Sequence, residues 1–400
     1  MSANQSGEIK HCLFMAYDFP PCRAIGGALR SAYFAKYLPE FGWQPMVVAL
    51  AEEQSVVEQY PGVTRVASLT PYKRPYEVTP YGWALNVYRL LRRMFKSRQV
   101  DLIYVSCPPF PQAVAALLLK RFFSCPLVVD FRDAWSMDPY VEGSRLKGFL
   151  YKNIFPYVEK IVLEAAEKFI ANTPSMYDAY LEQYPVLDGK IVLIPNGYDE
   201  DDFKEHGDSP SGNKVFTLLY CGRFGIGGRD PWLLLEAIKR FVATKGNVLR
   251  LLVVGEADLL RASVDRMGLA DIFDFAGVLP HDQAVSLMFD ADVLLLYQEK
   301  SEARVSAVAG KTYEYLRAGR PIWAILPPGD NLDIIKRFAG RYELVSDYKI
   351  ESMVQSLQTL YWDWEKGLLA EPLVISKDYG EQYNRRALSE KLVQVFNSLV

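Results

Sequence analysis

The segment Tyr220–Arg229 of the chain reads YCGRFGIGGR and combines glycines with arginines at the end of an apolar run. A helical stretch begins near Pro231, since proline is favoured in the first turn of a helix. The guanidinium groups of Arg223 and Arg229, together with accessible backbone N–H groups, suit a diphosphate. A surface loop with solvated arginines is the alternative. The spacing favours anion binding.

Two adjacent glycines, Gly26 and Gly27, come after the first apolar run and before a helical stretch over 28–41. Glycines at a helix start let backbone N–H groups approach a phosphate or a sugar, where the helix dipole also helps. A plain strand-to-helix turn would use the same residues. The spacing is not GxGxxG, so it does not indicate a dinucleotide site.

Three charged residues, Asp130, Arg132 and Asp133, lie at the end of a strongly apolar run in the segment VDFRDAW. Charges in this position are costly if they are buried without partners, and they are plausible if they face a cleft. The alternative is an ion pair within the segment, Asp130–Arg132 or Arg132–Asp133, that orders the loop.

The segment Gly310–Pro321, GKTYEYLRAGRP, predicts a helix that ends at Gly319 in a left-handed cap. Glu314 lies on a mostly apolar face of this helix. A carboxylate accepts two hydrogen bonds, which matches the diol of a ribose. The alternative is an ion pair with Lys311, three residues earlier on the same helix.

Short apolar runs alternate with helical stretches along the whole chain, which predicts α/β structure with parallel sheets. Two such series occur, and the polar, turn-rich segment 206–214 separates them. We therefore expect two doubly wound Rossmann-like domains, 1–205 and 206–375, facing a central cleft, and a C-terminal helix over 376–400, for which packing back on the first domain and packing on the second are both open. The expected strands are 11–17, 46–51, 102–106, 127–131, 169–172, 191–194, 216–221, 249–254, 273–275, 293–297, 322–325 and 343–345.

Composition excludes several classes of protein. Lys and Arg total 45 against 48 Asp and Glu, so the chain has no basic excess for nucleic-acid binding. Five cysteines without a CxxC pair argue against a disulfide framework or a structural zinc site. The chain has no apolar run long enough to span a membrane and no apolar signal core at its start, so we expect a cytoplasmic protein.

The order and spacing of these four segments resemble glycosyltransferase family 4, whose two-domain architecture is called GT-B. Further similar segments are Pro195–Asp199, PNGYD, and Gly277–His281, GVLPH. The resemblance covers nearly the whole chain. It implies a retaining transferase that uses a nucleotide-sugar donor.

The resemblance also implies roles for individual residues. Arg223 and Arg229 would be catalytic by stabilising the charge that builds on the leaving diphosphate. Glu314 would hold the ribose hydroxyls, and the backbone near Val278 and Leu279 would meet the base. Further donor-binding residues would be Gly222, Lys311 and Thr312, while Gly26 and Gly27 would face the diphosphate or the acceptor.

The sequence departs from the family pattern at two positions. Many members have a second glutamate where this chain has Ser306, and the chain looks like the branch that has a lysine near Lys311 instead. Many members have a histidine where this chain has Arg132, so Asp133 becomes the candidate polar residue near the reacting sugar. Whether Asp133 acts as a base, orients the acceptor or anchors the loop stays open.

We expect no metal and no cofactor. The segments 199–201 and 290–292 are formally D-x-D, but we interpret their acids as solvated turn or helix-end residues. Cationic arginines and helix N-termini can supply the positive charge that a metal would provide.

The segment 72–99 is basic, with interleaved apolar and aromatic side chains, and 145–158 has a similar composition. Such helices can lie on an anionic membrane surface, which would fit a lipid-linked acceptor. The alternative is a pair of helices with apolar faces toward the core and solvated charges. The expected location is the cytoplasm, including the inner face of the membrane.

The leading hypothesis is a metal-independent transferase that moves a sugar from a UDP- or GDP-sugar to a glycan or lipid-linked acceptor in bacterial envelope or exopolysaccharide synthesis. Lipopolysaccharide is one such glycan. A nucleotide-sugar epimerase with the same architecture is the second hypothesis. The third is a catalytically silent partner subunit.

Overall fold

The computed structural model describes residues 9–22, 25–51, 62–70, 79–95, 100–137, 145–204, 212–224, 231–298, 307–371, 373 and 376–400. The chain divides into two compact units. The first comprises Met1–Asn196 together with Arg385–Val400, and the second comprises Gly197–Asn384. Each unit is a parallel sheet covered by helices, so the predicted α/β fold with two Rossmann-like sheets is confirmed.

The first unit contains a seven-stranded sheet with the order β3-β2-β1-β4-β5-β6-β7. Its paired strands are all parallel. The short strand β3 is missing from the prediction, because three residues at a sheet edge give no recognisable periodicity. The strands are β1 (Lys10–Met15), β2 (Trp43–Leu50), β3 (Thr64–Val66), β4 (Leu102–Cys107), β5 (Leu127–Phe131), β6 (Lys168–Ala171) and β7 (Ile191–Leu193).

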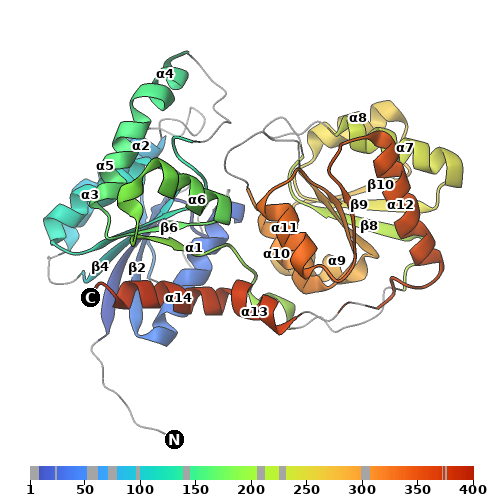
Figure 1. The fold of residues 1–400 in the computed structure, drawn as a ribbon. Helices are drawn as coiled ribbons and strands as arrows, with labels where there is room; N and C mark the ends of the chain where they lie inside the picture. The colour runs from blue at the N-terminus through green and yellow to red at the C-terminus, as the bar shows by residue number, and fades with distance from the viewer. Residues whose placement is uncertain are drawn as a thin grey trace, which may run out of the picture. The chain divides into compact units, whose positions relative to one another are not determined.

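Helices cover both faces of this sheet (Figure 1). On one face, α1 and the C-terminal α14 lie side by side and share an apolar cluster with the strands. On the other face, α3 packs against both α2 and α5. The helices are α1 (Ile25–Tyr37), η1 (Leu38–Phe41), α2 (Thr79–Met94), α3 (Pro111–Phe123), α4 (Arg145–Asn153), α5 (Phe155–Ala165), α6 (Pro174–Gln183), η4 (Pro185–Leu187) and α14 (Arg385–Asn397).

Helix α1 begins three residues earlier than predicted. It starts at Ile25, so Gly26 and Gly27 lie within its first turn instead of preceding a helix at Ala28. The first N–H groups of a helix have no partner inside the helix. The two glycines therefore still leave accessible N–H groups at this end.

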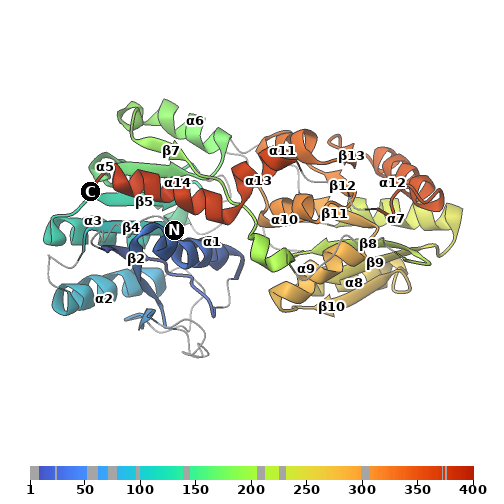
Figure 2. The same ribbon diagram turned by 90° about the horizontal axis from the view of Figure 1, so that it is seen from below.

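The second unit contains a six-stranded parallel sheet with the order β10-β9-β8-β11-β12-β13. Figure 2 shows its helices from below. One apolar cluster joins the sheet to α7, α8 and α12, and another joins it to α9, α10 and α11. The strands are β8 (Phe216–Cys221), β9 (Leu249–Val254), β10 (Phe273–Gly277), β11 (Val293–Tyr297), β12 (Ile322–Ile325) and β13 (Tyr342–Val345). The helices are η5 (Glu200–Phe203), α7 (Trp232–Lys245), α8 (Asp258–Met267), α9 (His281–Asp290), α10 (Gly310–Ala318), α11 (Asp330–Phe338), α12 (Ile350–Glu365) and α13 (Lys377–Tyr383).

None of the helices in the described part of the chain is both long enough and apolar enough to cross a membrane.

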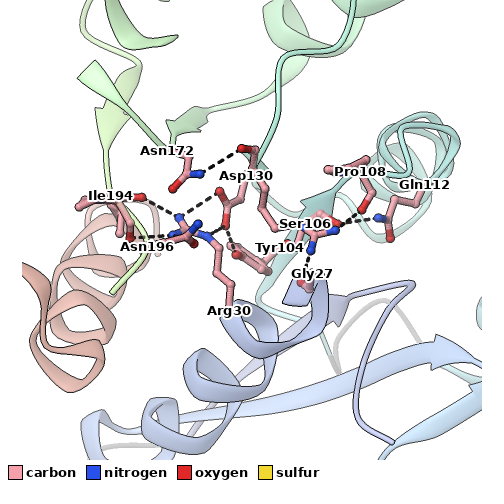
Figure 3. A network of polar contacts seen from close by, with 12 residues as sticks. Gly27, Arg30, Tyr104, Ser106, Pro108, Gln112, Asp130, Asn172, Ile194 and Asn196 are labelled. Atoms are coloured by element: carbon pink, nitrogen blue, oxygen red, sulfur yellow. Dashed lines mark hydrogen bonds and ion pairs between the residues drawn. The ribbon is translucent and has the colours of Figure 1, made fainter. Parts of the chain in front are cut away.

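A buried ion pair between Arg30 of α1 and Asp130 of β5 joins the helix to the middle of the first sheet (Figure 3). The two side chains are 2% and 0% exposed. Two hydrogen bonds connect them, from Nε to Oδ2 at 2.8 Å and from Nη2 to Oδ1 at 3.1 Å. The sequence left open a pairing of Asp130 with Arg132; the structure gives Asp130 to Arg30 instead.

Further groups complete the hydrogen bonding of this pair. The Tyr104 hydroxyl donates to Asp130, and burial, reinforced by the charge of Asp130, raises the pKa of Tyr104 so that its proton stays in place. Arg30 also donates to the backbone carbonyls of Ile194 and Pro195, at 2.8 Å each. Because two buried charges are stable only when their remaining groups are satisfied, these contacts fix the segment after β7.

We expect Asp130→Ala to lower the free energy of unfolding by about 3–5 kcal/mol, because it leaves a buried guanidinium without its carboxylate. Urea unfolding followed by tryptophan fluorescence measures the loss. The double variant Arg30→Ala/Asp130→Ala is the control, and its loss should be well below the sum of the two single losses. Additive losses would show that the two residues do not act as a pair.

Candidate functional site

In the second sheet, the order in which successive strands are added reverses between β8 and β11. The chain runs outward from β8 through β9 to β10, and then from β11 through β12 to β13. In open parallel sheets, ligands bind beyond the carboxyl ends of the strands at such a switch point. Strand β8 ends at Cys221, so Gly222 and Arg223 lie at this point, as the sequence predicts.

The loops after β8 and β9 contact each other backbone to backbone. Gly222 donates its N–H to Val254 at 2.8 Å. A Cβ at Gly255 would lie 2.3 Å from the Gly222 carbonyl oxygen, and Gly255 has a φ of +124°. Only glycine fits at 255 without moving the loop that holds Arg223. The sequence analysis missed this glycine because it stands alone after an apolar run.

Lys311, in the first turn of α10, points toward the same loop. Its ammonium lies 3.6 Å from the centroid of the Tyr220 ring, a cation–π contact. A Cβ at Gly222 would be 3.1 Å from the Lys311 Nζ. The Tyr220 hydroxyl donates to the Arg223 carbonyl at 3.1 Å, which ties the ring to the loop. A positive charge is thus held directly against the end of β8.

Arg223 is more exposed than Lys311. Its Nε is 3.4 Å from Oε2 of Glu256, and the two side chains are 47% and 60% exposed. Exposed ion pairs of this kind contribute little to stability. The guanidinium can therefore exchange this partner for an anionic ligand at small cost.

Glu314, one turn after Lys311 on α10, lies beside His281 at the start of α9. Its Oε1 is 3.4 Å from the His281 Nε2, which is also 3.3 Å from Oδ2 of Asp202. Glu314 is 14% exposed, so its carboxylate is mostly enclosed while it still reaches the surface. The sequence analysis weighed Lys311 as the partner of Glu314 and did not anticipate that His281 contacts it.

The Cys221 thiol lies near two of the charged residues of α10, Lys311 and Glu314. Burial raises its pKa to about 12, the charge of Lys311 opposes this rise and that of Glu314 adds to it. The thiol is therefore protonated at neutral pH. Lys311 and Glu314 therefore both contribute to the electrostatic potential at the end of β8.

The remaining candidates of the second unit differ in position. The Thr312 side chain is fully buried and donates to Asn331 at 2.7 Å, so it secures α10 to α11. Val278 is 65% exposed, and Leu279 packs on an apolar cluster. Arg229 lies outside the described residues. The donor-binding roles of these residues stay predictions.

The first sheet has its own switch point, between β1 and β4. Arg132, which follows β5, donates to the carbonyls of Gly27 and Pro108, the latter at 2.5 Å (Figure 3). Its Nη2 lies 3.8 Å from Asp18. The partners predicted for Arg132 in the sequence, Asp130 and Asp133, are thus replaced by groups that follow β1 and β4, because the side chain reaches back across the sheet edge.

Gln112 links the same two strand ends. Its amide donates to the Ser106 carbonyl at 2.6 Å and accepts from the Tyr17 N–H at 3.2 Å. The side chain is fully buried. Asp133, beside Arg132 in the loop after β5, is exposed. It lies at the carboxyl edge of this sheet, and its chemical role stays a prediction.

One acid of each D-x-D segment, Asp199 and Asp292, is buried, which corrects the expectation for these two, whereas Asp201 and Asp290 are exposed as expected. Asp199 is 1% exposed and accepts from the Asp201 N–H at 3.0 Å, and Asp292 is 0% exposed and accepts from the Thr217 N–H at 2.8 Å. Both are therefore used to order the backbone. Among the described residues, no group of three or more His, Cys, Asp or Glu side chains is arranged to hold a metal ion.

Residues 25–202 match the family model described as Glycosyltransferase Family 4. The match covers most of the first unit and a little under half of the chain. This part of the chain therefore has the sequence features of that family. A search of curated proteins finds no significant match.

Solved structures resemble the whole chain. A structure of HepE from Anabaena in complex with UDP and glucose is 16% identical, with a TM-score of 0.68 and coverage of 98% of this chain and 100% of that one. Sucrose-phosphate synthase from Thermosynechococcus elongatus is 16% identical, with a TM-score of 0.70 and coverage of 98% and 99%. WaaG, described as a glycosyltransferase involved in lipopolysaccharide biosynthesis, is 15% identical, with a TM-score of 0.63 and coverage of 97% and 99%. At these identities the likeness shows the fold, two Rossmann-like sheets as in GT-B glycosyltransferases.

Gly27→Ala should displace the Arg132 side chain, because the new Cβ would lie 2.3 Å from the Arg132 Nη1. We expect a loss of about 1–3 kcal/mol in the free energy of unfolding. Gly148→Ala, in helix α4 with nothing within 4 Å of the added Cβ, is the matched control and should be neutral or stabilising. If Gly27→Ala destabilises Arg132→Ala as much as it destabilises the parent chain, the clash with Arg132 is not the cause.

Proposed function

We propose that the protein is a retaining glycosyltransferase that transfers a sugar from a UDP- or GDP-sugar to a glycan or lipid-linked acceptor, in bacterial envelope or exopolysaccharide synthesis. The observation that carries this proposal is the match of residues 25–202 to Glycosyltransferase Family 4. The cationic and carboxylate groups at the β8 switch point of the second unit support a nucleotide-sugar donor.

The donor diphosphate binds at the loop after β8. Lys311 supplies a charge held against Gly222, and Arg223 supplies a guanidinium that can leave Glu256 for a phosphate. Arg229, from the same glycine-rich segment, is proposed to join them. Positive groups that are already in position stabilise the charge that builds on the leaving diphosphate without rearranging during the reaction. These cations support a mechanism that needs no metal.

Glu314 binds the ribose hydroxyls of the donor. The contact of its Oε1 with His281 fixes the orientation of the side chain. The position of the second carboxylate oxygen, Oε2, is therefore fixed as well. His281 is itself held by Asp202, so the carboxylate is oriented from outside its own helix. The exposed backbone around Val278 would lie against the base.

The acceptor side of the reaction belongs to the first unit in this proposal. Gly26 and Gly27 present N–H groups of the first turn of α1 to the diphosphate or the acceptor. Asp133, exposed after β5, lies near the reacting sugar. Peripheral membrane contact through 72–99 and 145–158, at the inner face of the membrane, would bring a lipid-linked acceptor to this unit.

Names of similar structures support parts of the proposal. HepE was solved with UDP-glucose as well as with UDP, which favours a uridine nucleotide among the donors. The description of WaaG names lipopolysaccharide biosynthesis, which supports a glycan of the bacterial envelope as the acceptor class.

UDP or GDP at 100 times its dissociation constant should add about 2.7 kcal/mol to the stability of the folded chain. Thermal shift assays with UDP, GDP, ADP and their sugars identify the base. Glu314→Gln should weaken the active nucleotide roughly ten- to hundredfold, because it removes a charged acceptor of hydrogen bonds. The 2′,3′-dideoxy nucleotide, which lacks both hydroxyls, should bind the parent chain and the variant equally.

Glu351→Gln, an exposed change on α12, is the matched control for this measurement. An equally large loss of affinity for the 2′,3′-dideoxy nucleotide in Glu314→Gln would show that Glu314 does not act through the ribose hydroxyls. The absence of any shift with all three nucleotides would remove the donor site from the proposal.

Lys311→Met should lower kcat for sugar transfer by about a hundred- to a thousandfold, because the leaving diphosphate loses a charge held in position. Transfer of radiolabelled sugar to a membrane extract measures it, and Lys336→Met on α11 is the control. Donor conversion without an acceptor would identify an epimerase instead. Nucleotide binding with no turnover would identify a silent partner subunit.

A further inference from the structure

The first unit has an apolar groove between helices α2, α3 and α5, on the face of the sheet opposite α1. Its volume is about 360 Å³, within the range of small-molecule sites. All of its lining lies in the described part of the chain. The residues that matter below are Tyr81, Leu85, Ala115, Leu118, Trp135 and Phe155.

The lining is apolar or aromatic throughout, and its polar side-chain groups are the hydroxyls of Tyr81 and Tyr88 and the indole N–H of Trp135. Tyr81, Leu85 and Leu118 are 51%, 46% and 42% exposed, so large apolar side chains stand at the mouth of the groove. An extended peptide would bring backbone N–H and C=O groups that these walls cannot satisfy. A hydrocarbon chain makes no such demand.

The inner wall of the groove is rigidly built. The Trp135 ring stacks on Phe110 with centroids 4.9 Å apart. The backbone N–H of Trp135 donates to the Tyr180 hydroxyl at 3.0 Å, and that hydroxyl donates to the buried Glu159 at 2.5 Å. These contacts hold the wall open from behind, so a ligand would enter a site that is already formed.

The surroundings of the groove are positively charged. Helices α2, α3 and α4 contain no acidic residue. The Arg92 guanidinium lies over the rings of Tyr88 and Phe122, at 5.2 and 5.0 Å, which places it where α2 meets α3. On α5, the exposed Glu164 is paired with Lys160. The described basic side chains of these helices include Arg89, Arg92, Arg93, Arg121 and Lys152, while Lys120 is paired with Glu167.

We propose that this groove binds the hydrocarbon chain of a lipid that carries a phosphate headgroup, with the chain between α2, α3 and α5 and the phosphate against the basic side chains around them. The inference rests on the proposed function for its biological meaning, since the lipid would be the carrier of the acceptor. The proposal goes further than contact with a membrane surface, because it gives the hydrocarbon chain of the lipid an internal site of limited volume.

The test uses decyl, dodecyl, tetradecyl and hexadecyl phosphate below their micelle concentrations. Affinity should rise about fourfold for each methylene that enters the groove, and should level off once the groove is full. A chain with bromine at its end should quench tryptophan fluorescence. Most of this quenching should be lost in Trp135→Phe and retained in Trp43→Phe, which changes a tryptophan of the opposite, α14-covered face.

Two variants separate the groove from general partitioning. Ala115→Leu fills the groove from its floor and should weaken decyl phosphate roughly tenfold. Leu85→Asp places a carboxylate at its mouth and should weaken it at least as much, whereas Leu368→Asp, a change at a somewhat more exposed leucine of the second unit, should have no effect. Equal affinities for the parent chain and both groove variants would overturn the proposal, and so would affinity that rises with chain length without levelling off.

Failure of this inference can be told from failure of the proposed function. Alkyl phosphate binding needs neither a donor nor turnover, and nucleotide binding is measured on the same samples. Groove binding without nucleotide binding would refute the transferase and leave the lipid site. Nucleotide binding with no saturable quenching at Trp135 would refute the lipid site alone.

Discussion

The buried pair of Arg30 and Asp130 is the constraint on which the first unit depends. It places a full charge in the middle of a sheet, where an isolated carboxylate would be very unfavourable. The guanidinium of Arg30 neutralises that charge. Its remaining donors bind the carbonyls of Ile194 and Pro195, just before the first segment of this unit ends at Asn196. One side chain therefore sets the distance between α1, β5 and the segment after β7. Everything at the carboxyl edge of the sheet is positioned relative to these three elements.

The same physical rule organises both candidate sites. In a parallel sheet the carboxyl ends of all strands lie at one edge. A space opens at this edge where the strand order reverses. Each unit brings a cation to that space and seats it against a glycine: Arg132 against Gly27, and Lys311 against Gly222. A Cβ at Gly27 would lie 2.3 Å from the Arg132 Nη1 and displace the guanidinium, whereas one at Gly222 would lie 3.1 Å from the Lys311 Nζ and need only a small shift of the ammonium. The absence of a Cβ is thus a requirement of charge placement at Gly27, while at Gly222 the φ of +139° is the stronger demand for glycine.

Much of the fold was predictable from the sequence, and the partners of charged residues were not. Buried parallel strands are apolar on both faces, so runs such as Leu102–Cys107 and Val293–Tyr297 stand out in the sequence. Glycine-rich ends of strands likewise marked both switch points. Asp130, however, pairs with a residue a hundred positions away, and Glu314 contacts His281 from another helix. Local spacing favoured Arg132 and Lys311, because a sequence shows neighbours along a helix or loop and hides those that folding brings together.

The groove of the first unit shows where the same limitation affects function. Its sequence signal was the basic, aromatic character of α2 and α4, which indicates a surface and leaves its shape open. The shape comes from Trp135, whose ring stacks on Phe110 and whose backbone is held by Tyr180 and, through it, by Glu159. Burial raises the pKa of Glu159, and hydrogen bonds from three hydroxyl groups oppose this rise. The same hydrogen bonds hold the carboxyl in a closed polar cluster behind the apolar wall. A polar cluster that fixes an apolar wall is an arrangement that favours a specific ligand over general adhesion, because a wall that could collapse would close the space.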